Sequence, residues 1–440
     1  MSSTRRVRWI AMSMASLVLV AGCDADAEDP EPSGGADPQE ISVMVSGDPE
    51  ELEAYRLVAQ GFEASRSGVT VNLIEIADRD EMIARLGTSI AGGDAPDLFL
   101  LNYRYYGQFQ AKGALEPLNA YLQSSEAFSA EEFYPEAMVA FQEDGEQTCM
   151  PQNVSSLVVY YNEKLFKQAG VAYPEPNWSW ISMVQAAMKL TKDTDGDGAI
   201  DQYGLGVDPE IIRAAPFIWS NKGTLTNDEA DPTRYTLTTP EATQAIQAFL
   251  DLRSRAGVTP TDEEAESADF ESRFLDGSLG MIMESRKVVP AFRTIEDFGW
   301  NVAALPVHQV PATVLHSDAY CMTADADDKD AAWAYLEYAL GTEGQQIAVG
   351  TGRTVPSMRA VAESDVFLDP TASPADSQVF LDNIPLLHAV PHIATWPQIE
   401  DVTNGLFEEA YYEPGGGEAP ELVVAITQQT KDLFADADGG

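Results

Sequence analysis

The sequence predicts an α/β fold in two domains. After position 40 the hydrophobic pattern runs strand, helix, strand, helix and strand, an order that is typical of a parallel sheet covered by helices. About 400 of the 440 residues follow that point, which is more than one ordinary hydrophobic core holds. The hydrophobic content of 45% is ample for two packed domains.

The first helix has the clearest start signal. It follows a predicted strand at 41–45, and Asp48, Pro49 and Glu51 suit the N-cap, first and third helical positions. Apolar residues then recur at helical spacing, at Leu52, Tyr55, Ala59 and Phe62. We expect a strand at 69–76, a helix at 81–90 and a short buried strand at 97–101, and later helices from position 239, at 328–340 and at 421–434.

The charge of the chain excludes one class of partner. There are 71 acidic and 26 basic residues, which give a formal net charge of −45. Nucleic-acid binding needs a basic face, so we expect no nucleic-acid partner. The acidity is typical of a protein that stays soluble in an exposed compartment. The common catalytic motifs are also missing from the sequence, and we expect no enzymatic activity.

Residues 1–23 have the features of an export signal. Three arginines between positions 5 and 8 precede an apolar run at 10–20 that is too short to span a bilayer. The ending Val-Ala-Gly-Cys at 20–23 resembles the bacterial lipoprotein box, which implies lipidation of Cys23; an ordinary secretory peptide is the alternative. Residues 24–40 are acidic, rich in Pro and Gly and free of large apolar groups, so we expect a flexible linker there.

The stretch 151–180, PQNVSSLVVYYNEKLFKQAGVAYPEPNWSW, holds the most informative pattern. It contains a proline, a small polar segment, a buried run that ends in Tyr-Asn, then Leu-Phe, an Ala-Gly helix end and a proline before a tryptophan. These positions are Pro151, Ser155, Val158, Tyr161, Asn162, Leu165, Phe166, Ala169, Gly170, Pro174 or Pro176, and Trp178. In order and spacing they resemble the family 1 extracellular solute-binding proteins, the ligand receptors of ATP-driven importers.

Other segments resemble the same family, among them 92–102 with 107–122, 274–281, 304–306 and 352–356. The resemblance implies a two-lobed fold of the periplasmic-binding-protein type II, in which each lobe is a mainly parallel sheet flanked by helices and a hinge joins the lobes. On this basis we place lobe 1 at 41–150 and 314–362, and lobe 2 at 151–313 and 363–440.

The resemblance also implies a function. The protein would capture a carbohydrate, an oligosaccharide or a glycoside, between its lobes and deliver it to the permease subunits of an ABC importer. It would be a monomer without a required cofactor, anchored by lipid to the outer face of the cell membrane, or on the periplasmic side in a Gram-negative cell. The alternatives are the same fold with another solute (polyamine, glycerol phosphate or a metal complex), a sugar-sensing surface protein without transport, and a glycan-acting enzyme. A glycerol-phosphate ligand would need more positive charge than the predicted cleft offers.

A sugar site needs flat aromatic rings for C–H faces and polar side chains for hydroxyls. From the resemblance we expect Trp219 and Trp396 to stack on sugar rings. Polar contacts are expected at strand-to-loop ends, where open α/β sheets present ligand groups. These candidates are Ser46, Asp48, Asn102, Tyr103, Arg104, Asn153, Ser155, Glu284, Arg286, Asp318 and Arg353. Packing, surface exposure or helix capping are the alternative roles, above all for Asp48.

Two cysteines are left if Cys23 takes a lipid. Cys149 and Cys321 form an even remainder in an exported protein, and the resemblance puts both on strands at the hinge. We expect a disulfide between them; two free buried thiols are the alternative.

The loop 193–201, DTDGDGAID, is the best metal candidate. It resembles the calcium loops of EF-hands and dockerins, with carboxylates at Asp193, Asp195, Asp197 and Asp201 and a glycine at loop position 6. Loop position 12, where a bidentate carboxylate belongs, is Gly204. A structural calcium site and a plain acidic turn are both open.

Overall fold

The computed structural model describes residues 39–437. The predicted signal peptide, Cys23 and residues 24–38 of the predicted linker lie outside the described residues. The first strand begins at Gln39, so positions 39 and 40, predicted as linker, belong to the sheet instead. Their backbones pair with Val69 and Thr70 of the neighbouring strand, which accounts for their order.

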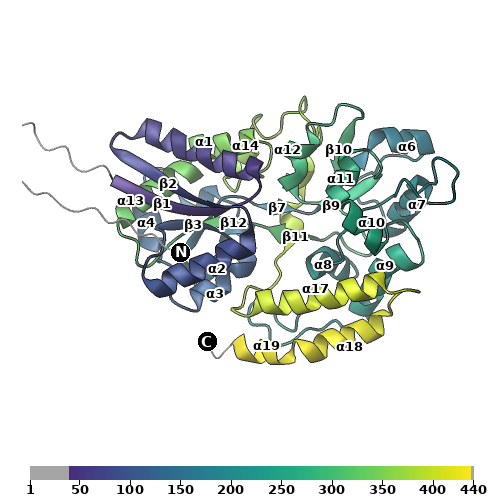
Figure 1. The fold of residues 1–440 in the computed structure, drawn as a ribbon. Helices are drawn as coiled ribbons and strands as arrows, with labels where there is room; N and C mark the ends of the chain where they lie inside the picture. The colour runs from purple at the N-terminus through teal and green to yellow at the C-terminus, as the bar shows by residue number, and fades with distance from the viewer. Residues whose placement is uncertain (1–38, 438–440) are drawn as a thin grey trace, which may run out of the picture. The chain divides into compact units, whose positions relative to one another are not determined.

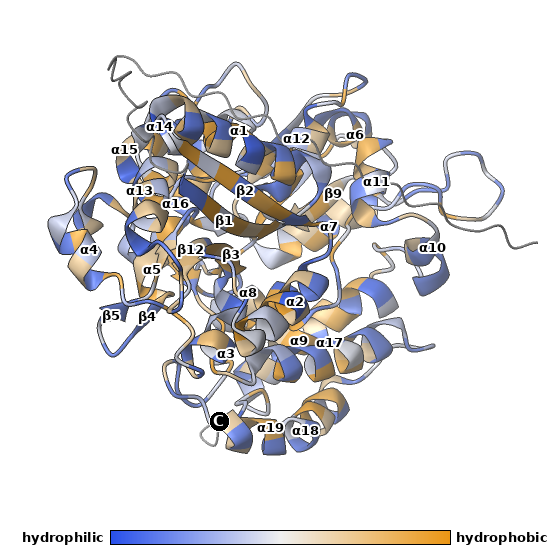
Figure 2. Cartoon of the chain, turned by 60° about the vertical axis from the view of Figure 1, so that its left-hand side comes forward, coloured by the Kyte–Doolittle hydropathy of each residue, from blue (hydrophilic) through white to orange (hydrophobic). Residues whose placement is uncertain are grey.

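The first lobe is built around a five-stranded sheet of order β2-β1-β3-β12-β6 (Figure 1). β1 (Gln39–Ser46), β2 (Val69–Ile76) and β3 (Leu98–Asn102) pair in parallel, joined by α1 (Pro49–Ser65) and α2 (Arg79–Gly92), as the sequence predicts. Asp48 caps α1 as expected, because its side chain accepts a hydrogen bond from the Glu51 amide. Helices α1 and α2 cover opposite faces of the sheet (Figures 1 and 2).

Two antiparallel strands complete this sheet. β12 (Asp318–Met322) pairs with β3, which sets Asp318 opposite Asn102, and β6 (Cys149–Pro151) pairs with the far side of β12. Cys321 lies opposite Cys149, and a disulfide joins the two with their Cα atoms 4.2 Å apart. The bond therefore connects neighbouring strands whose cysteines are 172 residues apart in the chain.

The second lobe is built around a three-stranded sheet of order β10-β8-β9. β8 (Val158–Asn162) runs antiparallel to both β9 (Met281–Glu284) and β10 (Trp300–Ala303). This arrangement differs from the mainly parallel sheet that the sequence predicts for this lobe. The reason is topological, because β8 enters directly from the segment that crosses between the lobes and so runs against both strands that flank it.

Two of the three chain segments that cross between the lobes lie side by side. β7 (Ser155–Ser156) pairs antiparallel with β11 (Thr313–His316), and β13 (Leu387–His388) pairs with the other edge of β11. The chain leaves the first sheet after β6, passes through β7 into β8, and returns from β10 through β11 into β12. β7 and β11 lie between the two sheets (Figure 1). Polar side chains from both lobes can therefore meet at this junction.

The remaining elements cover the two sheets. Those of the first lobe are η1 (Tyr103–Tyr105), α3 (Tyr106–Gln110), α4 (Asn119–Ser124), η2 (Ala130–Glu132), α5 (Pro135–Val139), β4 (Gln142–Glu143), β5 (Glu146–Gln147), α13 (Lys329–Leu340), α14 (Thr342–Gly350) and α15 (Arg359–Ala362). Those of the second lobe are α6 (Glu163–Ala169), α7 (Trp180–Leu190), α8 (Ile211–Ser220), α9 (Pro240–Ser254), α10 (Asp262–Ser267), α11 (Phe270–Leu275), η3 (Arg286–Val288), α12 (Val289–Phe292), α16 (Gln378–Asp382), η4 (Ile384–Leu386), α17 (Trp396–Tyr412), α18 (Ala419–Gln429) and α19 (Lys431–Asp436).

The last helix of the sequence-based prediction is broken in the structure. Residues 421–434 are divided between α18 and α19, and the break lies at Thr430. At this break both the hydroxyl and the amide of Thr430 donate to the Ile426 carbonyl. Residues of the central strands are largely hydrophobic, and α1 and α2 carry both hydrophilic and hydrophobic residues (Figure 2). Within residues 39–437, no helix has both the length and the apolar character needed to cross a bilayer.

The disulfide should contribute measurably to stability. Replacing Cys149 and Cys321 together by serine is expected to lower the free energy of unfolding by about 2–5 kcal/mol, because the bond restricts the unfolded chain over a long loop. Urea denaturation of the two proteins measures the difference, and a reductant should destabilise only the wild-type protein. Two alkylatable thiols in unfolded, unreduced wild-type protein would contradict the bond.

Candidate functional site

A polar cavity of about 180 Å³ lies where the two lobes meet the crossing segments. The first lobe contributes α1, α2 and the end of β3, and the second lobe contributes α8 and the end of β9. Its lining comprises Glu51, Ala54, Tyr55, Arg79, Asn102, Arg104, Gln152, Asn153, Ser155, Arg213, Glu284, Ser285, Lys287, His316, Asp318, Arg353, Thr354 and Val355. We call this the central cavity.

Asp318 stands at the start of β12, where the chain re-enters the first lobe. Asn102 Nδ2 donates to one carboxylate oxygen and Asn153 Nδ2 to the other, each at 3.0 Å. Burial opposes ionisation of Asp318, but the charge of Arg79 and the two amide hydrogen bonds outweigh it and lower the pKa of the carboxyl. Asp318 is therefore an ionised acceptor. It is held in place by the side-chain amide of Asn102, at the end of β3, and by that of Asn153, in a segment that crosses between the lobes.

The wall from the second lobe is a buried ion pair. Arg213, near the start of α8, donates through both Nη atoms to the carboxylate of Glu284, at 3.1 and 2.7 Å. Burial would raise the pKa of Glu284, but Arg213 and then Lys287 overcome it and lower that pKa to about 2. The two-pronged geometry fixes both side chains and leaves the Arg213 Nε–H without a hydrogen-bond partner, with the Glu210 carboxylate 3.8 Å away.

Arg353 and Arg104 are held by acids that belong to other elements. Arg353 donates to Asp48 Oδ2 at 2.6 Å and to Glu51 Oε2 at 2.5 Å, and also to the Lys287 carbonyl of the second lobe at 3.2 Å. Arg104, after β3, pairs with Glu400 of α17 at 2.8 Å. Both arginines thus connect the first lobe to the second at the border of the cavity.

Three buried polar atoms in the cavity wall have no hydrogen-bond partner within the described residues: Ser155 Oγ, Arg213 Nε and His316 Nε2. Burial, followed by the nearby charges of Arg213 and Arg104, lowers the pKa of His316 to about 3, so its imidazole is neutral at physiological pH. A buried polar atom without a partner costs free energy. All three side chains line the cavity, so a solute that carries hydroxyl groups is a candidate partner for these atoms, and this is the strongest sign that the cavity is a binding site.

Seven of the predicted contact residues line the central cavity: Asn102, Arg104, Asn153, Ser155, Glu284, Asp318 and Arg353. Ser46 lines a much smaller hollow that it shares with Asn102 and Asp318. Asp48 caps α1 and holds Arg353, but it does not line the cavity. The structure brings these residues together because strand ends of the first sheet and the crossing segments converge on the same junction.

Trp219 and Trp396 do not reach the central cavity, in contrast to the sequence-based expectation. Trp219 is 8% exposed, stacks on His388 with ring centroids 4.8 Å apart, and lines a separate cavity of about 180 Å³. Trp396 is fully buried and is the first residue of α17. Its ring packs against Tyr235 inside the second lobe.

Tyr103 and Arg286 are also buried away from the cavity. The Tyr103 hydroxyl accepts a hydrogen bond from the Val390 amide at 3.2 Å. The Arg286 guanidinium lies over the rings of Phe367 and Phe380, at 4.4 and 5.1 Å from their centroids. Both side chains follow a strand, as a ligand contact would, but they turn into the packed interior rather than toward the junction.

Sequence reasoning missed three central members of the wall. Arg79 begins α2, Arg213 lies in α8 and His316 ends β11. Arg213 left a readable signal, because it is a single charge in the apolar run IIRAAPFIW at 211–219. A lone arginine on a buried helix needs a partner, and that requirement points to Glu284.

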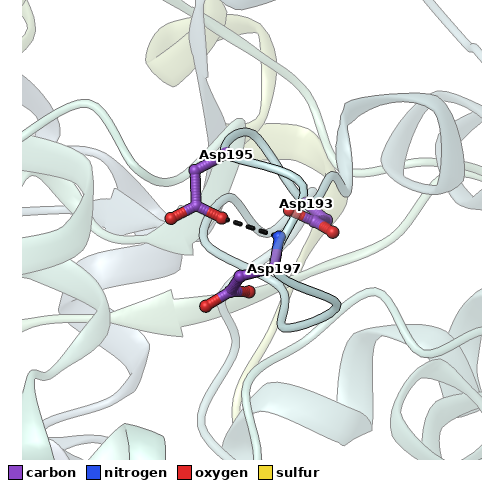
Figure 3. Close-up of side chains that lie close together, drawn as sticks. All are labelled: Asp193, Asp195 and Asp197. Atoms are coloured by element: carbon purple, nitrogen blue, oxygen red, sulfur yellow. Dashed lines mark hydrogen bonds between the residues drawn. The ribbon is translucent and has the colours of Figure 1, made fainter.

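The acidic loop at 193–201 lies apart from the central cavity. Figure 3 shows Asp193, Asp195 and Asp197 around one small space, and their carboxylate oxygens lie within 4.8 Å of one another. Asp201 does not join them, because its carboxylate accepts hydrogen bonds from the Thr194 amide and hydroxyl, which lower its pKa. The loop therefore offers three of the four predicted carboxylates.

If calcium binds this loop, its affinity should be weak. We expect a dissociation constant on the order of 10⁻⁴ to 10⁻³ M, because the strong ligand at loop position 12 is missing. Calorimetry on chelator-treated protein measures it, and the double substitution Asp195→Asn, Asp197→Asn should abolish the heat. Asp228→Asn, which changes a carboxylate of another exposed turn, is the matched control. Submicromolar affinity would refute the argument, and no heat at millimolar calcium would favour the plain turn.

Comparison with known proteins identifies the family of this chain. The chain matches the family model for bacterial extracellular solute-binding proteins over residues 58–375. A binding protein of Brucella abortus is 24% identical to this chain over 392 residues, which cover 87% of this chain and 89% of the relative. The erythritol/L-threitol-binding protein of Mycolicibacterium smegmatis is 22% identical over 394 residues that cover 79% of this chain and 80% of the relative.

A solved structure is also similar. The ABC substrate-binding protein Lmo0181 of Listeria monocytogenes, in complex with cycloalternan, superposes with a TM-score of 0.82 at 25% identity. The match covers 92% of this chain and 100% of the Listeria chain. The two-lobed fold that the sequence predicts is thereby confirmed. The chain belongs to the bacterial extracellular solute-binding proteins.

Proposed function

We propose that the central cavity binds a carbohydrate or a related polyol and that the protein delivers this solute to the permease subunits of an ABC importer. The observation that carries the proposal is the group of unpartnered buried polar atoms, Ser155 Oγ, Arg213 Nε and His316 Nε2, in one wall between the lobes. The relatives from Mycolicibacterium and Listeria support it, because the name of the first gives erythritol and L-threitol as its ligands and the second was solved with cycloalternan.

The chemistry of the cavity suits hydroxyl groups. Each hydroxyl donates one hydrogen bond and accepts others, so a polyol needs acceptors and donors close together. Asp318 is an ionised acceptor, Arg79 and Arg213 are donors, and neutral His316 does either according to its tautomer. Hydrogen bonds to charged groups are stronger than neutral ones, which favours recognition of an otherwise neutral solute.

Transport by lobe closure follows from the same arrangement. Solute held between Asp318 of the first lobe and Arg213 of the second would favour the form in which the lobes are together, and the permease would receive that form. We keep the lobe boundaries proposed above, 41–150 with 314–362 and 151–313 with 363–440. A role in binding rather than catalysis, and a monomeric state, are part of this proposal.

The lipid anchor is the part of the protein's location that belongs to the proposal. A member of an extracellular family is exported. Attachment to the membrane through a lipid on Cys23 rests on the Val-Ala-Gly-Cys ending alone. A sugar-sensing surface protein would share every feature of the cavity, and neighbouring genes for importer permeases would separate the two roles.

Asp318→Asn should weaken solute binding by about tenfold or more, because an amide in place of the carboxylate loses a charged acceptor. The test begins with thermal unfolding in erythritol, mannitol, glucose and maltotriose, since a sugar at 100 times its dissociation constant stabilises by roughly 2.7 kcal/mol. Titration of the stabilising sugar into variant and wild type then gives both affinities. Asp325→Asn, in an exposed turn of the same lobe, is the control. Equal affinities for Asp318→Asn and wild type would remove Asp318 from the site.

Cys23→Ala should release the protein from the membrane fraction, because the lipid on this cysteine would be its anchor. Fractionation of cells that express the variant or the wild type measures the change. Cys149→Ser is unsuitable as a control, because it breaks the disulfide, whereas Ser33→Ala alters a residue of the predicted linker and leaves Cys23 in place. Unchanged membrane retention of Cys23→Ala would show that the cysteine is not the anchor.

A further inference from the structure

The size of the central cavity limits the solute. Its volume of about 180 Å³ lies below the roughly 300–1,000 Å³ of sites that enclose drug-sized ligands. A disaccharide already has the size of a small drug. The cavity therefore has room for a single sugar ring or a linear sugar alcohol. A trisaccharide would require the Arg104–Glu400 ion pair and the hydrogen bond from Arg353 to the Lys287 carbonyl, which join the lobes at its border, to separate.

The carboxylates around the cavity offset its positive charges. Its lining has five cationic side chains, Arg79, Arg104, Arg213, Lys287 and Arg353, and three carboxylates, Glu51, Glu284 and Asp318. Five further carboxylates outside the lining form ion pairs with those same cations: Asp48, Asp208, Glu210, Glu271 and Glu400.

Arg79 is the exception among the cations. Within the described residues it forms no ion pair, and its charge is offset by Asp318, which it stabilises in the ionised form. An anionic solute needs cations that are not already neutralised. Acidic sugars and phosphate esters would therefore enter a site that has no surplus of positive charge. The pairing of the cations, rather than their number, therefore argues against glycerol phosphate as the solute.

The cavity also has no broad aromatic surface. Tyr55 and His316 are its only rings, and neither Trp219 nor Trp396 lines it. Longer sugars gain much of their affinity from stacking on tryptophan or tyrosine faces. Directed hydrogen bonds from Asp318, Ser155 and Arg213 suit a compact molecule that presents hydroxyls on all sides.

We infer that the solute is an uncharged monosaccharide or linear sugar alcohol, and that neither oligosaccharides nor acidic sugars are its physiological ligands. This inference rests on the proposed function and narrows it. It differs from the expectation of an oligosaccharide or glycoside that the family resemblance implies, and the experiment below decides between the two.

Calorimetric titration of the purified full-length protein with three classes of probe tests the inference. The compact neutral probes are erythritol, mannitol and glucose, the large neutral probe is maltotriose, and the compact anions are glucuronate and glycerol 3-phosphate. We expect one compact neutral probe to bind at least about tenfold more tightly than maltotriose and both anions. Its affinity should change by less than about twofold between low and high salt, because salt screens interactions between charges.

A matched pair of variants shows whether the solute occupies this cavity. Ser155→Ala removes one unpartnered hydroxyl without adding volume and should lower the affinity for the compact probe by about threefold to tenfold. Ser272→Ala, on the exposed side of α11, should leave it unchanged. Equal affinities for Ser155→Ala and wild type would place the solute elsewhere and overturn the inference.

The other outcomes separate the inference from the proposed function. Tightest binding of maltotriose would overturn the size limit and leave carbohydrate binding intact. Tightest binding of glucuronate or glycerol 3-phosphate, with an affinity that falls as salt rises, would overturn the claim of neutrality. Absence of binding by every probe would count against the proposed function itself, and with it the inference.

Discussion

The hydrogen bonds from Asn102 and Asn153 to Asp318 hold the first sheet and the crossing segment together at the junction of the lobes. Asn102 ends β3, Asn153 lies in the segment that leaves the first lobe, and Asp318 begins the strand that returns to it. These hydrogen bonds therefore join the end of β3 to the segment by which the chain leaves the first lobe and to the strand by which it returns. A solute that binds Asp318 contacts the point through which both crossings pass, and this is how binding could bias the arrangement of the lobes.

The acidity of the protein and the cations of the cavity are compatible because four of the five cations form ion pairs and Asp318 offsets the charge of Arg79. A chain with a net charge of −45 places five cationic side chains around one small cavity. Arg213 is neutralised by Glu284, Arg353 by Asp48 and Glu51, and Arg104 by Glu400. Burial of unpaired charges would cost several kcal/mol each. The pairing lets the wall carry charged, directional groups while the site as a whole stays close to neutral.

The first strands and helices of the first lobe were predicted well because their sequence signals lie within the elements themselves or a few residues away. Asp48 caps α1 through the amide three residues ahead, and the alternation at 69–76 marks β2 whatever else the chain does. The antiparallel sheet of the second lobe could not be read in the same way. The direction of β8 depends on where the chain enters the lobe, which no pattern within Val158–Asn162 records.

The site was predictable where it depends on strand ends and unpredictable where it depends on packing. Asn102, Asp318 and Glu284 were found because they lie at the ends of short buried strands, and such ends face ligand sites in α/β proteins. Arg286 has the same sequence context and Trp219 lies near the end of α8, yet two phenylalanines cover the first and His388 covers the second. Their burial depends on residues some 80 to 170 positions away, so the sequence near them carries no sign of it.

The most direct test of this account is a crystal structure of the protein with the neutral sugar or sugar alcohol that binds it best. The account predicts one molecule in the central cavity, with its oxygens within hydrogen-bond distance of Ser155 Oγ, Arg213 Nε, His316 Nε2 and the Asp318 carboxylate. A solute bound against Trp219 in the neighbouring cavity, with the three polar atoms still without partners, would contradict it.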